Sequence, residues 1–219
     1  MAKYYPIFLN IQGKKCVVVG GGNVAWRKAC SLKEAGARVT VVSPEFCPEL
    51  EKETGIERIK QKYDEGFLKD TLIVIASTDD EEVNKKIYYD ATKRGLLVNV
   101  VDKPEFCSFI VPSSIMRGDL CISISTGGAS PALARNIREC LERQFGNEYD
   151  EFTQLLSEIR RKILSEIREE STRRDILQRI AGLDLLEVVK KNGISEAKKK
   201  MLEIISEKIS RKGVSQQRL

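Results

Sequence analysis

The sequence has 219 residues, a formal net charge of +5 and 42% hydrophobic residues, which suits one large domain, or a domain with an appendage, around a substantial core. Lys and Arg alternate with Asp and Glu, so the modest positive charge does not call for a nucleic-acid partner. No apolar run reaches the roughly eighteen residues of a membrane span, and the N-terminus lacks the zones of a signal peptide. We therefore expect a cytoplasmic protein with no membrane partner.

Histidine is absent, which removes the usual general base near neutral pH and the commonest transition-metal ligand. Proton chemistry must then fall to carboxylates, hydroxyls, thiols or the substrate, and we predict no metal site. The six cysteines are scattered without a C-x-x-C pair and are expected to be reduced core thiols. They are Cys16, Cys30, Cys47, Cys107, Cys121 and Cys140.

Apolar runs alternate with helical patterns through the first hundred or so residues, which is typical of a parallel sheet built from strand-helix-strand units. Nearly continuous apolar character, as in TLIVIAS, indicates strands that are buried on both faces. The predicted strands are 14–19, 37–43, 56–61, 71–77 and 96–102, and the predicted helices are 23–36 and 80–95.

The pattern changes after residue 107, where strands are predicted at 108–113 and 119–126. They are too close for a helical crossover, so they should pair antiparallel. Ser130 and Pro131 are typical of a helix start, and this helix should end at Gly146. From residue 147 onward, apolar residues as far as Ile209 recur at threes and fours, which predicts amphipathic helices before a frayed tail, GVSQQRL. We place a domain boundary near residue 112.

Residues 20–25 satisfy G-x-G-x-x-A between a strand and a helix, which favours a dinucleotide site. Gly20 permits the tight turn, Gly22 lets the backbone approach a pyrophosphate, and Ala25 lets helix and strand pack closely. Backbone N–H groups at the helix start, including those of Asn23 and Val24, would face the anion. The alternative is a glycine turn in an unliganded sheet.

The acidic residue expected about twenty positions on, which would bind the ribose of NAD, is missing. Ser43 ends the second strand before Pro44 and Glu45, and its hydroxyl and the Glu45 carboxylate are the candidates for the ribose. No arginine follows to recruit the extra phosphate of NADP, so NAD is favoured. Thr78 follows the fourth strand at the same edge, where the nicotinamide end would lie; helix capping is its alternative role.

Asp102 closes the fifth predicted strand and is the leading candidate for acid-base work in a chain without histidine. Its alternative is a turn aspartate before Lys103 and Pro104. The loop Ser125-Thr126-Gly127-Gly128 opens onto a helix start and is a second anion-receptive loop. Together, these features favour the hypothesis that the chain binds a dinucleotide beside a polyanionic partner.

Three segments carry a resemblance to a known family: YPIFLNIQGKKCVVVGGGNVAWRKACSLKEAGARVTVVSP, IASTDDEEVN, and NVVDKPEFCSFIVPSSIMRGDLCISISTGGASPALAR. In their order and completeness they resemble the precorrin-2 dehydrogenase family, the dehydrogenase and ferrochelatase module of siroheme synthase, across at least residues 4–150. The resemblance implies an NAD-dependent oxidation of precorrin-2 to sirohydrochlorin, with an optional insertion of ferrous iron to give siroheme.

The resemblance also assigns roles to residues. It implicates Asp102 in the chemistry, places Ser125, Thr126, Gly127 and Gly128 against the tetrapyrrole, and implies a homodimer whose partners interlock after the nucleotide domain. The expected fold class is therefore α/β, with a Rossmann-like parallel sheet, a small α+β dimerisation segment and a C-terminal helical domain. The corresponding ranges are 1–112, 113–146 and 147–219.

A polycarboxylate tetrapyrrole needs cationic donors in its pocket, and four cations flank the two candidate loops. Each has the alternative role of a solvated surface charge. They are Lys103, Arg117, Arg135 and Arg138. A competing interpretation, from another functional class, is a non-enzymatic, dinucleotide-sensing regulatory domain, which shares the sheet and the glycine turn. A third interpretation is a helix-rich interaction protein.

Overall fold

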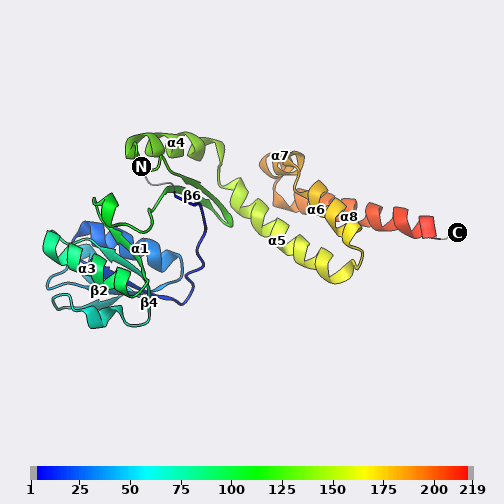
Figure 1. Cartoon of the computed structure of the whole chain (residues 1–219). Coiled ribbons are helices and arrows are strands. Elements are labelled where there is room, and N and C mark those ends of the chain that lie inside the picture. Colours follow the sequence, from blue (N-terminus) through cyan, green and yellow to red (C-terminus); the bar gives the residue numbers. More distant parts are fainter. Residues whose placement is uncertain (1–3, 217–219) are drawn as a thin grey trace. The chain divides into compact units, whose positions relative to one another are not determined.

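The computed structural model describes residues 4–216, with the side chains of residues 4–208 other than 183. The chain divides into two compact units, residues 1–111 and 112–219, each with a hydrophobic core of its own (Figure 1). The predicted division into three parts stays a prediction.

The first unit is built on a five-stranded parallel sheet of order β3-β2-β1-β4-β5. Chain order reverses between β1 and β4, and ligands of such sheets bind in the crevice outside the carboxyl ends of the strands at this switch point. The strands are β1 (Lys15–Val19), β2 (Arg38–Val42), β3 (Glu57–Ile59), β4 (Thr71–Ala76) and β5 (Leu97–Val100).

Helices cover both faces of this sheet. Cys16 and Val18 of β1 point to one face, where Ala25 and Ala29 of α1 are buried against them. The alternate residues of β1 pack on the other face against Ile87 and its neighbours in α3. This two-sided burial explains the continuous apolar runs of the strands. The helical segments are α1 (Asn23–Glu34), α2 (Pro48–Lys52), α3 (Glu81–Lys93) and the 3-10 turns Glu65–Leu68 and Pro104–Phe106.

The Glu53 carboxylate ties α1 to the end of α2. Lys33 donates to it at 2.7 Å, and the Trp26 indole and the Cys30 thiol each donate at 3.4 Å. These bonds, led by the one from Lys33, hold the pKa of Glu53 below its usual range. Because the three donors are spaced by four and three residues, they share one flank of α1 and fix the rotation of the helix about its axis.

The segment after β5 folds back along this edge strand. Ser108 donates its N–H to the Val98 carbonyl at 2.8 Å, its hydroxyl accepts the Val98 N–H at 2.8 Å, and Asn99 donates to the Phe109 carbonyl at 3.0 Å. These bonds satisfy polar groups that an edge strand would otherwise leave open. The predicted strand at 108–113 is therefore wrong, because its first residues pair with β5 in an irregular return.

The second unit begins with an antiparallel pair, β6 (Ser113–Arg117) and β7 (Leu120–Ile124), so the predicted pairing is confirmed with its first strand shifted. Ser130 accepts the Leu133 N–H at 3.2 Å and Pro131 occupies the first turn, as predicted for the start of α4. The helices are α4 (Pro131–Gln144), α5 (Glu148–Glu166), α6 (Glu170–Ile180), α7 (Leu183–Asn192) and α8 (Ile194–Gln216).

The last four helices enclose their own core, in which Ile159, Ile176 and Met201 are almost completely buried. Helix α8 extends to Gln216, so the predicted frayed tail is wrong for residues 213–216, whereas 217–219 and the Ile209 side chain lie outside the described residues. Over the part of the chain that the structure describes, no helix is long and apolar enough to cross a membrane.

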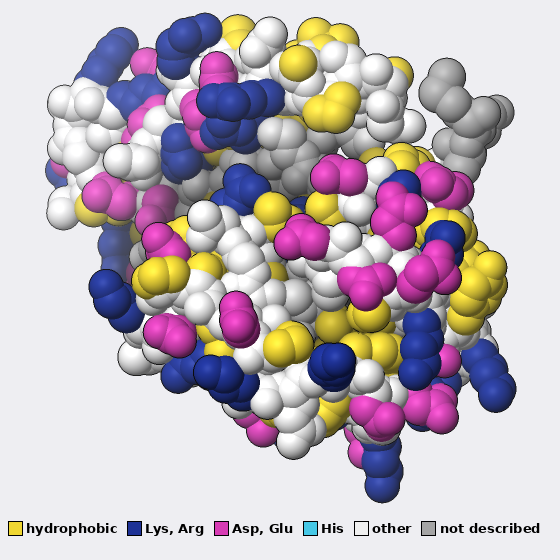
Figure 2. Space-filling view, turned by 90° about the vertical axis from the view of Figure 1, so that its left-hand side faces the viewer, with side chains coloured by type: hydrophobic (Ala, Val, Ile, Leu, Met, Phe, Trp, Pro, Cys, Tyr) yellow, Lys and Arg dark blue, Asp and Glu magenta, His cyan; other side chains and the backbone are white. Residues whose placement is uncertain are grey.

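The predicted fold class is confirmed: a parallel sheet with helices, then a two-stranded sheet, then a helical region. All six cysteines are free, but the expectation that they are core thiols is wrong for Cys140, which is exposed on α4, while Cys16 is buried. On the face shown in Figure 2, basic and acidic side chains are interspersed and no large field of one sign stands out.

Candidate functional site

The turn after β1 brings its backbone against the backbone after β4. Gly20 has φ +131°, a backbone conformation that residues with a side chain rarely adopt. It donates its N–H to the Val42 carbonyl at 2.9 Å. A Cβ at this position would overlap the Ser77 carbonyl oxygen. Gly20 is therefore required by the fold at the switch point of the sheet.

Gly21 is a residue that sequence reasoning missed. Its carbonyl accepts the Cys47 N–H at 2.7 Å, and a Cβ here would overlap the Glu45 carbonyl oxygen. The glycine turn thus packs directly on the loop that follows β2. The signal was present in the sequence, because a third consecutive glycine in the motif has no role in the turn itself.

Gly22 precedes α1 at its N-cap position with an ordinary φ of −84°, and a Cβ there would meet open space. No side chain caps α1 and its first turn holds no acidic residue, whereas Asp80 caps α3 and Ser130 caps α4. The first-turn N–H groups of α1, which start with Asn23 and Val24, therefore have no side-chain acceptor and attract an anion. These residues fit the pyrophosphate of a dinucleotide.

The loop after β2 supplies the predicted ribose candidates. Ser43 is buried, with its N–H donated to the Ile59 carbonyl at 3.1 Å, while Pro44 and Glu45 are exposed. The Glu45 carboxylate is therefore open to a ligand, and the Ser43 hydroxyl lies beside Gly21.

Thr78 follows β4 and takes part in a capping network. Its hydroxyl donates to Asn84 Oδ1 at 2.8 Å and accepts the Asp80 N–H at 3.2 Å, while Asp80 accepts N–H groups of the first turn of α3. The structure thus shows the capping role that was the alternative for this segment. Contact between Thr78 and a cofactor stays a prediction.

Asp102 is exposed and has φ +60°, one of two non-glycine residues with positive φ among those described. Two contacts hold its turn: Cys107 Sγ accepts the Val100 N–H at 3.3 Å, and Lys103 forms an ion pair with Glu81 of α3 at 2.8 Å. The contact with Glu81 raises the pKa of Lys103. The turn therefore presents an exposed carboxylate in a conformation that the surrounding contacts maintain.

The loop from Ser125 to Gly128 belongs to the second unit and has its hydroxyls engaged. Ser125 accepts the Gly127 N–H at 3.0 Å, and Thr126 accepts the Ser130 N–H at 3.0 Å and donates to the Ser130 carbonyl at 3.1 Å. Gly127 and Gly128 are exposed with φ of +62° and +89° and have open space around them. The loop is thus ordered by its own side chains and leaves its glycines open to a ligand.

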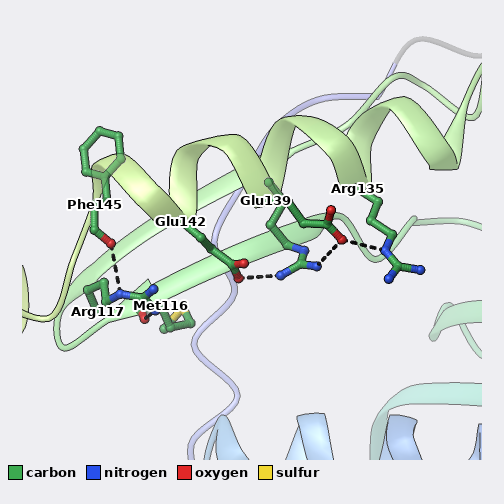
Figure 3. A network of polar contacts seen from close by, with 7 residues as sticks. Met116, Arg117, Arg135, Glu139, Glu142 and Phe145 are labelled. Atoms are coloured by element: carbon green, nitrogen blue, oxygen red, sulfur yellow. Dashed lines mark hydrogen bonds and ion pairs between the residues drawn. The ribbon is translucent and has the colours of Figure 1, made fainter.

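The cations predicted to bind substrate carboxylates have partners within the chain. Arg135 pairs with Glu139 at 2.8 Å, Arg138 pairs with Glu142, and Arg117 donates to the Phe145 carbonyl at 3.0 Å (Figure 3). Of these contacts, only the ion pair of Arg135 with Glu139 is exposed at both side chains. An exposed pair contributes about 0–1 kcal/mol, so a ligand carboxylate can replace Glu139 at little cost.

The structure brings one group of predicted site residues to the carboxyl edge of the sheet and leaves the rest in the second unit. At the sheet edge are Gly20, Gly22, Asn23, Val24, Ser43, Pro44, Glu45, Thr78 and Asp102; in the second unit are Ser125, Thr126, Gly127, Gly128 and Arg135. Among the side chains that the structure describes (residues 4–208 other than 183), no group of three or more Cys, Asp or Glu is arranged to hold a metal ion.

Comparison with known families matches both units. Residues 7–113 match a family model described as "Putative NAD(P)-binding", and residues 117–144 match one described as "Sirohaem biosynthesis protein central". The first range contains the glycine turn and Asp102, and the second contains the loop 125–128 and α4.

Among known proteins, the siroheme synthase of Nitrosococcus oceani is 42% identical over 75% of this chain and 36% of its own length. That of Thioalkalivibrio sulfidiphilus is 39% identical over 81% of this chain and 37% of its own. The chain therefore spans little more than a third of these relatives. A solved structure of SirC, a precorrin-2 dehydrogenase, superimposes with a TM-score of 0.77 and 27% identity, covering 93% of this chain and 100% of that one.

Replacing Gly22 with alanine separates cofactor binding from folding. We expect Gly22→Ala to keep stability within about 1 kcal/mol of the wild type, because the added methyl group meets open space and φ is ordinary. NAD affinity should fall about tenfold or more, since the methyl group projects where the pyrophosphate approaches. Thermal unfolding and calorimetric titration with NAD measure the two effects.

Gly20→Ala is the matched comparison. It should lower the unfolding temperature itself, because its methyl group would overlap the Ser77 carbonyl oxygen. If Gly22→Ala binds NAD as tightly as the wild type does, the glycine turn does not hold the pyrophosphate.

Proposed function

The chain belongs to the precorrin-2 dehydrogenase family, and on that basis we propose that it catalyses the NAD-dependent oxidation of precorrin-2 to sirohydrochlorin in siroheme biosynthesis. The observation that carries the proposal is one sheet edge that combines the uncapped start of α1 with the exposed carboxylate of Asp102. A dinucleotide-sensing domain would need the first feature but gives no reason for the second.

The glycine turn orients the cofactor. The N–H groups of Asn23 and Val24 bind the pyrophosphate, Gly22 leaves room for its approach, and the hydroxyl of Ser43 or the carboxylate of Glu45 binds the ribose. A carboxylate in this loop favours NAD over NADP, because it would repel a phosphate on the ribose. When bound, NAD supplies the acceptor for the hydride that leaves the macrocycle.

Asp102 accepts the proton that leaves the macrocycle in the same oxidation. Loss of a hydride and a proton removes two electrons and two hydrogens, so a base must take the proton. The Asp102 side chain is exposed and ionisable, and its turn is held by Lys103 and Cys107 rather than by a bond to the carboxylate itself. The carboxylate therefore stays available for a substrate.

The loop of the second unit contributes to substrate binding. We assign the open backbone at Gly127 and Gly128, the preceding residues Ser125 and Thr126, and the exposed Arg135 guanidinium to the tetrapyrrole and its carboxylates. Arg135 would exchange Glu139 for a substrate carboxylate, and the half-exposed Glu139 carboxylate would then be hydrated by solvent.

Ferrous iron insertion into sirohydrochlorin is a separate proposal. The pyrrole nitrogens of the substrate themselves hold the metal, so the protein needs only a carboxylate to accept the displaced protons. Asp102 fits that role as well. The proposed site of action for both steps is the cytoplasm, with no nucleic-acid or membrane partner.

A homodimer is proposed from the apolar surface of the second unit. A two-stranded sheet is marginally stable alone, and β6–β7 exposes Met116, while α4 exposes Leu133 and Ile137 four residues apart on one face. A second copy of the chain would cover these side chains and extend the short sheet.

An anaerobic assay with precorrin-2 and NAD tests the dehydrogenase. The wild type should form NADH and sirohydrochlorin together, and Asp102→Asn should lower kcat by about 10²–10⁴-fold, because the amide cannot accept the proton. The NAD dissociation constant of the variant should be unchanged. Asp79→Asn, a neutralised exposed aspartate in the loop after β4, is the control.

If the wild type binds NAD but produces no NADH from competent substrate, the dehydrogenase proposal is wrong and the chain is better interpreted as a dinucleotide-sensing domain. An Asp102→Asn variant with wild-type turnover would remove Asp102 from the mechanism.

Chelation is measured by following siroheme formation from sirohydrochlorin and ferrous iron under anaerobic conditions. We expect the wild type to exceed the uncatalysed rate and Asp102→Asn to lose most of that excess. A rate equal to that of the protein-free mixture would restrict the protein to the oxidation.

Light scattering after size-exclusion chromatography tests the dimer. We expect twice the chain mass of 24.7 kDa for the wild type and a shift to the single-chain mass for Ile137→Asp, because a buried unpaired carboxylate is costly in an interface. Leu164→Asp, at an exposed leucine of α5, is the control and should stay dimeric. A wild type of single-chain mass at micromolar concentration would contradict the proposal.

A further inference from the structure

Lys28 of α1 is a partly buried cation that the sequence pattern did not single out. Unlike Lys103 and Arg135, which pair with Glu81 and Glu139, it takes part in no ion pair or hydrogen bond among the described residues. An ammonium group carries three donors and is costly to remove from water without acceptors. A partly buried lysine in this state is therefore prepared for an anionic partner from outside the chain.

The rotation of α1 fixes the flank on which Lys28 lies. Trp26, Cys30 and Lys33 face Glu53 on the flank towards α2. Lys28 follows Trp26 by two residues, which is a turn of roughly 200° about the helix axis, so it lies on the opposite flank. Leu50 of α2 packs in the same core cluster as Val39 and Val41 of β2. Because β2 and β4 lie on opposite sides of β1, the opposite flank of α1 faces β4 and β5.

The residues that pack against α1 support this orientation of the Lys28 flank. Val101 and Phe109, from the segment that follows β5, pack against the cluster that contains Ala25 and Ala29 of α1. Side chains of a helix lean towards its N-terminus, and the N-terminus of α1 lies at the carboxyl edge of the sheet. The long Lys28 side chain therefore extends back towards the edge where Asp102 is found.

The charged groups around Lys28 indicate that its ammonium group lies near Asp102. Burial and the neighbouring Arg27 lower the pKa of Lys28, while the Asp102 carboxylate and the Cys107 thiol oppose this shift. Asp102 thus lies within electrostatic reach of the ammonium group yet forms no ion pair with it. Both groups keep their capacity for a ligand.

We propose that Lys28 binds a peripheral carboxylate of the tetrapyrrole and so positions the macrocycle carbon that loses its proton against Asp102. This inference rests on the proposed dehydrogenase function and deepens it by naming a specificity-determining residue. The macrocycle must come to Asp102 to be oxidised, and its periphery is rich in carboxylates. The cofactor pyrophosphate binds instead at the first-turn N–H groups of α1, so it does not neutralise Lys28.

Lys28→Met tests the proposal, because methionine keeps the apolar stem and removes the charge. We expect KM for precorrin-2, and the dissociation constant of sirohydrochlorin measured by absorbance titration, to rise about tenfold to a hundredfold, as for loss of a charge-assisted hydrogen bond. The dissociation constant of NAD should stay unchanged, and Lys28→Arg should restore most of the affinity.

Two readouts distinguish binding from a structural role. The unfolding temperature of Lys28→Met should equal or exceed that of the wild type, because an unpaired and partly buried charge is removed. Arg27→Met removes an equal charge from the exposed neighbouring position and should leave KM within about twofold of the wild type.

The inference is overturned if Lys28→Met binds sirohydrochlorin as the wild type does, or if it loses NAD affinity instead. Wild-type protein that neither binds sirohydrochlorin nor oxidises precorrin-2 would refute the proposed function, and this inference with it. If the wild type oxidises precorrin-2 and Lys28→Met has the same KM for precorrin-2 and the same dissociation constant for sirohydrochlorin, only the inference about Lys28 is refuted.

Discussion

The close approach of three backbone segments at the end of β1 is the constraint around which the first unit is organised. Gly20 lies against the Ser77 carbonyl after β4, and Gly21 lies against the Glu45 carbonyl after β2. No side chain fits at either contact, so the ends of three neighbouring strands have fixed relative positions. The start of α1, the loop after β2 and the loop before α3, which form the proposed cofactor site, all take their positions from this packing.

In the proposed mechanism, proton transfer in a chain without histidine depends on how the Asp102 carboxylate is presented. Asp102 adopts a left-handed conformation that costs on the order of 1 kcal/mol for a residue with a side chain, and the contacts of Cys107 and Lys103 with its turn offset this cost. These contacts use the backbone and neighbouring side chains and leave the carboxylate itself free. The geometry of the turn and the availability of its functional group are therefore maintained by different residues.

The parallel sheet could be predicted from sequence because strands buried on both faces read as apolar runs; the run at 14–19 became β1 at Lys15–Val19. The run after Cys107 was misread, because the bonds of Ser108 to Val98 depend on an edge strand that lies next to it only in the folded chain. Lys28 was missed for a related reason: helical periodicity reveals the apolar face, whereas its environment depends on contacts of α1 with Glu53 and with the segment after β5.

Contacts of polar side chains could likewise be predicted where they are local in sequence, and not where they join distant segments. Ser130 was identified as a cap from its own neighbourhood, since the residues that it contacts follow within three positions. The acidic partners of Arg135 and Arg138 lie four residues further along the same helix, a spacing that the sequence shows. The pairing of Lys103 with Glu81 could not be predicted, because the two residues meet only in the folded chain.

The Glu53 carboxylate makes the attachment of α1 to α2 sensitive to acid. Its pKa is held below the usual range by Lys33 first, then by Trp26 and Cys30, so the folded state binds the proton less readily than the unfolded chain does. Its contribution to stability is complete above the ordinary pKa of a glutamate and is lost as the pH falls through the lowered value. Protonation removes the negative charge that attracts three donors of α1, so acid would weaken the attachment of the helix whose first turn forms the proposed cofactor site.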